Sequence, residues 1–92
     1  MRNKVVLVTG GAQRIGAQVC RTFHEAGFNV IVHYRNSATD AKSLSEELNG
    51  YRRDSARAVQ ADLLAGEYKA FADTCRDAWG RLDCLVNNAS EF

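Results

Sequence analysis

Short apolar runs alternate with stretches of helical periodicity along the whole chain, and this alternation restricts the fold more than any other feature. The runs lie at 5–8, 30–34, 56–61 and 82–86 and consist largely of Val, Leu, Ile and Ala. They are too short for helices and are typical of strands that are buried on both faces of a parallel sheet. Parallel neighbours are joined through crossover helices, so the pattern predicts an α/β chain with the order βαβαβαβ.

The first helical stretch follows the run at 5–8. Ile15, Val19 and Phe23 recur every four residues, which predicts a helix with one apolar stripe. Gly27 is expected to end this helix as a left-handed cap.

Two further helices are predicted between the remaining strands. Either Ser37 or Asp40 can cap the second helix, and Asn49-Gly50 is expected to end it. Its apolar face consists of Ala41, Leu44 and Leu48. The third helix is expected to end at Gly80, and its apolar face consists of Tyr68, Phe71, Ala72, Cys75 and Trp79.

Right-handed crossovers in a doubly wound sheet predict the strand order 3-2-1-4, a Rossmann-type arrangement with helices on both faces. The chain then reverses direction between the first and fourth strands. Ligands bind outside the carboxyl ends of strands at such a switch point. Two loops open there, TGGAQRIG at 9–16 and NNASEF at 87–92, and a nucleotide is expected between them.

The loop TGGAQRIG has the features of a phosphate-binding turn. Gly10 and Gly11 permit a tight or positive-φ backbone, and Gly16 lets the following helix approach the sheet closely. Unpaired N–H groups of the first helical turn, aided by the helix dipole, can hold a pyrophosphate. Cofactor contacts are therefore predicted at Gly10, Gly11, Arg14, Ile15 and Gly16.

The second strand ends in HYRNS, where NAD-binding folds usually carry an acidic residue for the ribose hydroxyls. Arg35 stands there instead, 19 residues after Gly16, and no carboxylate is adjacent. A guanidinium favours a 2′-phosphate, so NADP (NADPH) is the predicted cofactor. Arg14 can reach the same phosphate from the glycine loop. The predicted contacts from this segment are Tyr34, Arg35, Asn36 and Ser37.

Composition limits the partners and the cellular location that can be expected for this chain. The 12 basic and 11 acidic side chains leave a net charge of +1, which argues against nucleic-acid polymers and membrane surfaces as partners. No apolar run approaches the roughly 20 residues of a membrane span, and MRNK does not begin a signal peptide, so a cytoplasmic protein is expected. The three cysteines are expected to be reduced and packed as apolar residues. His24 and His33 are expected to be structural, and no metal-ligand spacing is present.

Three segments together resemble the short-chain dehydrogenases/reductases over all 92 residues: TGGAQRIG, Asp62-Leu63 after the third strand and NNA at 87–89. Within that family the chain is most similar to the pteridine reductases. The similarity includes NSATDAKSLSEELN, VQADL and NNAS with a phenylalanine two residues later. Pteridine reductases often have HYHRS where this chain has HYRNS, so the basic residue stands one place earlier.

The resemblance implies several further roles. Asp62 would accept from the adenine amino group with Leu63 beside it, and Asn88 and Ala89 would shape the cofactor pocket. Ser90 would contact both pterin and cofactor, and Phe92 would stack on the pterin ring. A homotetramer is also implied for the full-length enzyme.

The catalytic pair of that family, Tyr-x-x-x-Lys, is absent from this sequence. Tyr34, Tyr51 and Tyr68 are followed four residues later by Ala, Ser and Ala. Residues 1–92 are therefore expected to be the amino-terminal NADP-binding half of a longer enzyme, with no catalytic residue of their own. The expected reaction is NADPH-dependent reduction of a pterin. The alternatives are a 3-oxoacyl-type or sugar-type dehydrogenase and a non-catalytic nucleotide-binding module.

Overall fold

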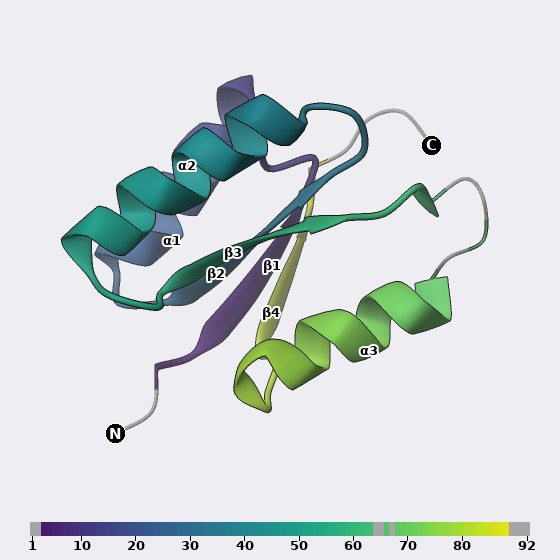
Figure 1. Ribbon diagram of the computed structural model, residues 1–92. Helices are drawn as coiled ribbons and strands as arrows, with labels where there is room; N and C mark the ends of the chain where they lie inside the picture. The colour runs from purple at the N-terminus through teal and green to yellow at the C-terminus, as the bar shows by residue number, and fades with distance from the viewer. Residues whose placement is uncertain (1–2, 64–65, 67, 89–92) are drawn as a thin grey trace.

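The computed structural model describes residues 3–63, 66 and 68–88 of the chain. Strands and helices alternate along it as predicted (Figure 1). The elements are β1 (Val5–Thr9), α1 (Arg14–Glu25), β2 (Asn29–Tyr34), α2 (Ala38–Tyr51), β3 (Ala56–Gln60), α3 (Tyr68–Trp79) and β4 (Cys84–Asn87).

The four strands form one parallel sheet with the order β3-β2-β1-β4, which confirms the predicted topology. β1 lies between β2 and β4, with Val6 opposite both Val30 and Cys84. Figure 1 shows α1 and α2 on one face of the sheet and α3 on the other. The fold is therefore a Rossmann-like, doubly wound α/β arrangement.

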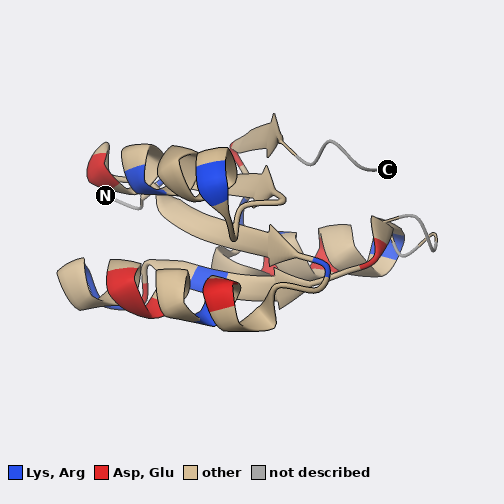
Figure 2. Ribbon diagram, turned by 90° about the horizontal axis from the view of Figure 1, so that it is seen from above, with Lys and Arg blue, Asp and Glu red and all other residues tan. Residues whose placement is uncertain are grey.

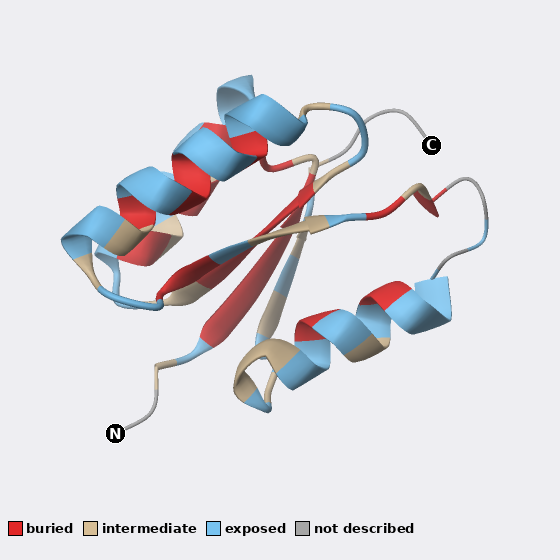
Figure 3. Cartoon of the chain, viewed as in Figure 1, coloured by how far each residue is buried: buried red, intermediate tan, exposed pale blue. Residues whose placement is uncertain are grey.

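Both faces of β1 are buried, as the apolar run predicted (Figure 3). Val6 and Val8 pack with the buried residues of α1 and α2. Val5 and Leu7 point the other way and pack with Phe71 of α3. β4 is more open because, among the described strands, it pairs with β1 alone, and Leu85 is 60% exposed.

The face of α1 that packs on the sheet differs from the predicted one. Ile15 is 73% exposed, and Val19 and Phe23 are only partly buried at the edge of the core. The residues that α1 buries are Gly16, Ala17, Cys20 and His24. The first of these residues must be small, because a Cβ on Gly16 would lie 2.3 Å from the Gly10 carbonyl oxygen. At the far end of the helix there is room for His24, whose ring contacts Ser55.

The ends of α1 and α2 confirm some predictions and correct others. Gly27 adopts the expected left-handed conformation, with φ of 101°. Ser37 occupies the position before α2, but its side chain makes no capping bond, and Asp40 lies in the first turn. The predicted stop at Asn49-Gly50 is wrong, because α2 continues to Tyr51.

Asn49 instead fastens the connection from α2 to β3. Its side-chain oxygen accepts from the N–H groups of Ser55 and Ala56, and its side-chain nitrogen donates to the Ala56 carbonyl. Asparagine often ends helices, but here its side chain hydrogen-bonds the helix to the start of the next strand.

The third helix and fourth strand also differ in detail from the predictions. Phe71 and Cys75 are the buried residues of α3, whereas Tyr68 is 57% exposed. Ala72 is exposed as well, so the buried stripe is narrower than predicted. β4 begins at Cys84, and Leu82 lies in the irregular segment before it.

The cysteines are unpaired thiols. Burial raises the pKa of Cys20 to about 12 and that of Cys75 to about 11. Both therefore stay protonated and behave as small apolar residues, as predicted. Cys84 is only half-buried and packs at the edge of the core.

Charged side chains of both signs are interspersed over the helices (Figure 2). Within the described part of the chain, no helix has the length and apolar character needed to cross a membrane.

Candidate cofactor-binding site

The loop between β1 and α1 is fixed from two sides at Gly10. The Gly10 N–H donates to Nδ1 of His33 at 2.9 Å, and its carbonyl accepts from Nδ2 of Asn88 at 3.1 Å. Gly10 is left-handed, with φ of 61°. The next N–H, of Gly11, donates to the His33 carbonyl at 3.0 Å. Two loop amides are thus used inside the protein, and helix geometry leaves those of residues 14–16 to face an anion.

Gly16 and Gly11 are required by close contacts. A Cβ on Gly16 would lie 2.3 Å from the Gly10 carbonyl oxygen and 2.6 Å from Nδ2 of Asn88. A Cβ on Gly11 would lie 2.9 Å from the Val8 carbonyl oxygen. Gly16 therefore lets the helix approach the loop itself and the end of β4, a closer constraint than the helix–sheet approach predicted from sequence.

Arg14 stands where a third glycine is common in such loops. Its backbone is left-handed, a conformation that glycine adopts more easily than other residues. Its φ is 54°, a left-handed conformation that costs a residue with a Cβ about 1–2 kcal/mol. The side chain is exposed, and within residues 3–63, 66 and 68–88 it makes no hydrogen bond or ion pair. It is therefore available to a ligand at the mouth of the loop.

Arg35 and Asp62 lie together at the carboxyl ends of β2 and β3. Nε of Arg35 is 3.7 Å from Oδ1 of Asp62, and the side chains are 47% and 33% exposed. The Arg35 carbonyl also accepts from the side-chain amide of Gln60. The residue predicted for a 2′-phosphate thus contacts the residue predicted for adenine, and a bound phosphate would compete for the guanidinium.

The ends of β1 and β4 are tied together by polar side chains. The hydroxyl of Thr9 accepts from the Asn88 N–H at 3.0 Å and lies 3.2 Å from Oδ1 of Asn87. These contacts bring the start of the glycine loop and residues 87–88 together at the predicted switch point.

The other predicted contacts occupy mixed environments. Asn36 is exposed and Ser37 half-buried, while Tyr34 packs partly against the core. Leu63 is buried, so its main chain is what a nucleotide could contact. The predicted contacts at Ala89, Ser90 and Phe92 lie outside the described residues.

His33 is predicted from sequence to be structural, and its contact with the glycine loop is seen only in the folded chain. A signal was present, because a polar residue inside a buried strand needs a hydrogen-bond partner. The bond between Gln13 and Asp40, which joins the loop to α2, was also missed. No sequence pattern indicated that pair.

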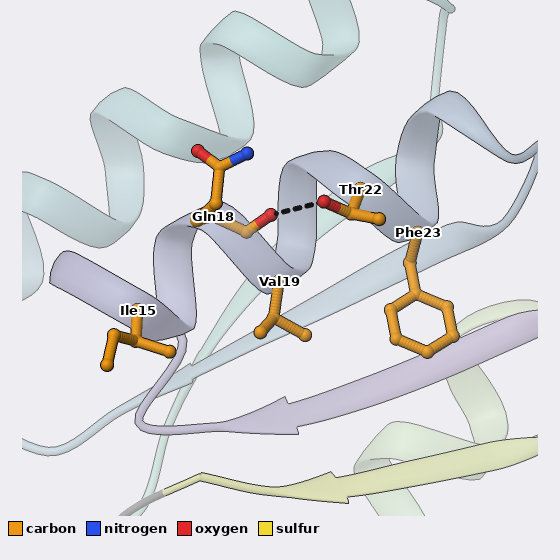
Figure 4. Close-up of a pocket in the computed structure, with 5 residues that line it drawn as sticks. All are labelled: Ile15, Gln18, Val19, Thr22 and Phe23. Carbon is orange, nitrogen blue, oxygen red and sulfur yellow. Dashed lines mark hydrogen bonds between the residues drawn. The ribbon is translucent and has the colours of Figure 1, made fainter.

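A groove of about 300 Å³ lies beside this site along α1. Figure 4 shows the side chains of Ile15, Val19 and Phe23 along one side of the helix, the stripe that sequence periodicity had picked out. The groove is apolar and lacks the convergent polar groups of the loop. Among the described residues, no cluster of His, Cys, Asp or Glu suits a metal ion.

Comparison with known proteins identifies the family of this chain. Residues 4–91 match the family described as short chain dehydrogenase. The chain is 41% identical to pteridine reductase 1 of Leishmania tarentolae, over 96% of this chain and 37% of the relative. It is 39% identical to the 3-oxoacyl-(acyl-carrier-protein) reductase FabG of Staphylococcus aureus, over 94% of this chain and 35% of the relative.

The chain therefore belongs to the short-chain dehydrogenase family, whose members use a nicotinamide dinucleotide. It spans about a third of the length of these curated relatives. The parts present here are the glycine loop and the strand ends that surround it.

Proposed function

We propose that the protein is an NADPH-dependent reductase and that these residues form its cofactor-binding part. The observation that carries the proposal is the set of charges at the end of β2. Arg35 stands there with no carboxylate next to it in the sequence, and its nearest acidic partner is Asp62 after β3, at 3.7 Å. Arg14 is exposed at the start of α1. Two guanidinium groups favour a 2′-phosphate, whereas an unphosphorylated ribose would call for an acidic acceptor.

The nicotinamide cofactor would lie across the open amides of residues 14–16, with its pyrophosphate at the start of α1. Adenine would reach Asp62 at the end of β3. Hydride transfer would be supplied by the cofactor, and the described residues would bind and orient it.

We propose a pterin as the substrate. The identity of 41% to a pteridine reductase and the segment NNASEF support this choice. Phe92 would stack on the flat ring, a contact worth about 0.5–1.5 kcal/mol beyond its buried area. A 3-oxoacyl thioester is the second candidate, because the identity to a 3-oxoacyl reductase is 39%.

Steady-state kinetics of the intact protein test both substrates. Wild type and Phe92→Ala are assayed with NADPH on a dihydropterin and on an acetoacetyl thioester. We expect turnover of the dihydropterin. Its KM should rise at least about 2- to 12-fold in the variant from the lost stacking alone, while NADPH affinity is maintained. Turnover of the thioester alone would assign the protein to the fatty-acid-type reductases. NADPH binding without turnover of either substrate would favour a non-catalytic module.

A further inference from the structure

His33 lies near the end of β2 and is almost completely buried, with 4% of its surface exposed. Its Nδ1 accepts from the Gly10 N–H at 2.9 Å, and its Nε2 lies 2.9 Å from the Ala61 carbonyl oxygen. A carbonyl oxygen can only accept, so Nε2 must carry the proton and Nδ1 the lone pair. The neutral Nε2–H tautomer is the one form that satisfies both contacts.

The ring is also held in orientation. Phe71 of α3 meets it edge to face, with ring centroids 5.1 Å apart and an angle of 61° between the planes. Close packing on this side prevents the imidazole from turning away from Gly10 without displacing Phe71.

His33 contacts both segments that the proposed nucleotide would touch. Its side chain and its carbonyl take the two consecutive loop N–H groups of Gly10 and Gly11. Its other nitrogen holds Ala61, the residue directly before Asp62. The left-handed turn at Gly10 is thereby fixed relative to the end of β3.

We propose that His33 is a positioning residue for nucleotide binding, acting through Gly10 on the phosphate loop and through Ala61 on the adenine side. This inference rests on the proposed function. A side chain that fills the space but accepts no hydrogen bond would leave the buried Gly10 N–H unpaired and loosen the loop.

His24 provides a matched control. It is also 4% exposed, but its Nε2 lies 2.7 Å from Oγ of Ser55, at the opposite end of the sheet. Losing this imidazole removes a similar buried hydrogen bond and leaves the glycine loop untouched.

The test compares NADPH affinity by titration calorimetry in wild type, His33→Leu, His33→Asn and His24→Leu, well below each melting temperature. We expect His33→Leu to bind NADPH and NADH about tenfold or more weakly. His33→Asn should recover most of that loss, because its side-chain oxygen can replace Nδ1 as the acceptor for Gly10. His24→Leu should lower the melting temperature and leave affinity unchanged.

A spectroscopic measurement on wild type tests the geometry directly. The ¹⁵N shifts of the His33 ring should report a neutral imidazole protonated at Nε2, and protonation at Nδ1 would overturn the proposal. Equal affinity in folded His33→Leu and wild type would also overturn it, and so would His33→Asn binding as weakly as His33→Leu. Wild type that binds neither cofactor would overturn the proposed function and, with it, this role for His33.

Discussion

The two ends of the parallel sheet use similar polar contacts in different ways. At the amino ends of the strands, the Asp83 carboxylate accepts from the Val5 N–H at 2.8 Å and from the Arg81 guanidinium at 2.6 and 2.7 Å. Arg81 and this N–H hold the pKa of Asp83 below its usual range. At the carboxyl ends, Gly10 is fixed by His33 and Asn88, while the exposed Arg14 and the first turn of α1 face outward.

The same contrast holds for the two buried histidines. The His24 ring hydrogen-bonds to Ser55, and the His24 carbonyl accepts from Arg52. These contacts join α1 to the segment before β3 and do not involve the glycine loop. His33 bonds to the loop that carries left-handed Gly10 and Arg14. The two histidines are equally buried, at 4% exposed. They differ in the segment that each one hydrogen-bonds, and only His33 contacts the glycine loop.

The largest expected effect is at the carboxyl end. Gly16→Val should abolish binding of both NADPH and NADH, a loss of about 100-fold or more, because its Cβ would collide with the Gly10 carbonyl and Asn88. Calorimetric titration measures this. Gly27→Ala, at an open position with nothing near its would-be Cβ, is the control and should keep affinity despite some backbone strain. Retained binding by Gly16→Val would show that the loop is only a turn.

A smaller effect is expected at Arg35. Arg35→Ala should weaken NADPH binding by about 1–3 kcal/mol and leave NADH nearly unchanged. Arg21→Ala is the matched control, because Arg21 is similarly exposed at 44% but pairs with Glu47 on α2. Competition assays with both cofactors give the ratio of NADPH affinity to NADH affinity for each variant. An equal loss of both cofactors in Arg35→Ala would contradict the 2′-phosphate assignment.

At the amino ends of the strands, loss of His24 should lower the free energy of unfolding and leave cofactor binding unaffected. Burial, aided by the charge of Arg52, lowers the pKa of His24. Below about pH 6.5 the unfolded chain therefore takes up a proton that the folded chain resists, and stability falls with acidity. His24→Leu should be less stable near neutral pH by about 1 kcal/mol and should lose less on acidification. Melting curves at several pH values check this, and parallel curves for the two proteins would contradict it.

The smallest effect concerns Arg14, whose left-handed backbone conflicts with its side chain. Arg14→Gly should relieve that strain and change stability by less than about 1 kcal/mol, because the entropy of the unfolded glycine offsets part of the gain. NADPH affinity should fall while NADH affinity stays the same. Chemical denaturation and cofactor titration measure the two effects separately. A gain in NADPH affinity would place the phosphate away from Arg14.

The fold was predictable because its signals are local and redundant. The run Val5–Val8 is too short and too β-branched for a helix, which indicated a buried strand. The alternation of runs and helical stretches, with right-handed crossovers, predicted the order β3-β2-β1-β4. Periodicity predicted the wrong buried face of α1. Gly16 lies against Gly10 and Asn88, which leaves Ile15 exposed and Val19 and Phe23 at the edge of the core. The face that packs is set by tertiary crowding, which a single helix does not encode.

The site was predictable only in outline. Glycine spacing located the loop, and strand order brought it to Asn88. The pairing of Arg35 with Asp62 and the contact of His33 with Gly10 depend on strand register across the sheet. Register is set by the packing of all four strands together, so these contacts could be read only from the folded chain.

The bond between Asn88 and Gly10 joins residues 78 positions apart in the sequence. β1 and β2 can pair early, because one short helix separates them, but β4 must close a much longer loop to reach β1. We therefore expect the glycine loop to reach its final geometry at a late step of folding. During synthesis, a nascent chain that ends before residue 88 already contains every glycine of the loop. Of the two side chains that hydrogen-bond to Gly10, it has His33 but lacks Asn88. If the proposed site binds a nucleotide, we expect that affinity to appear only with the completed sheet, after the strand, loop and helix that contain the motif.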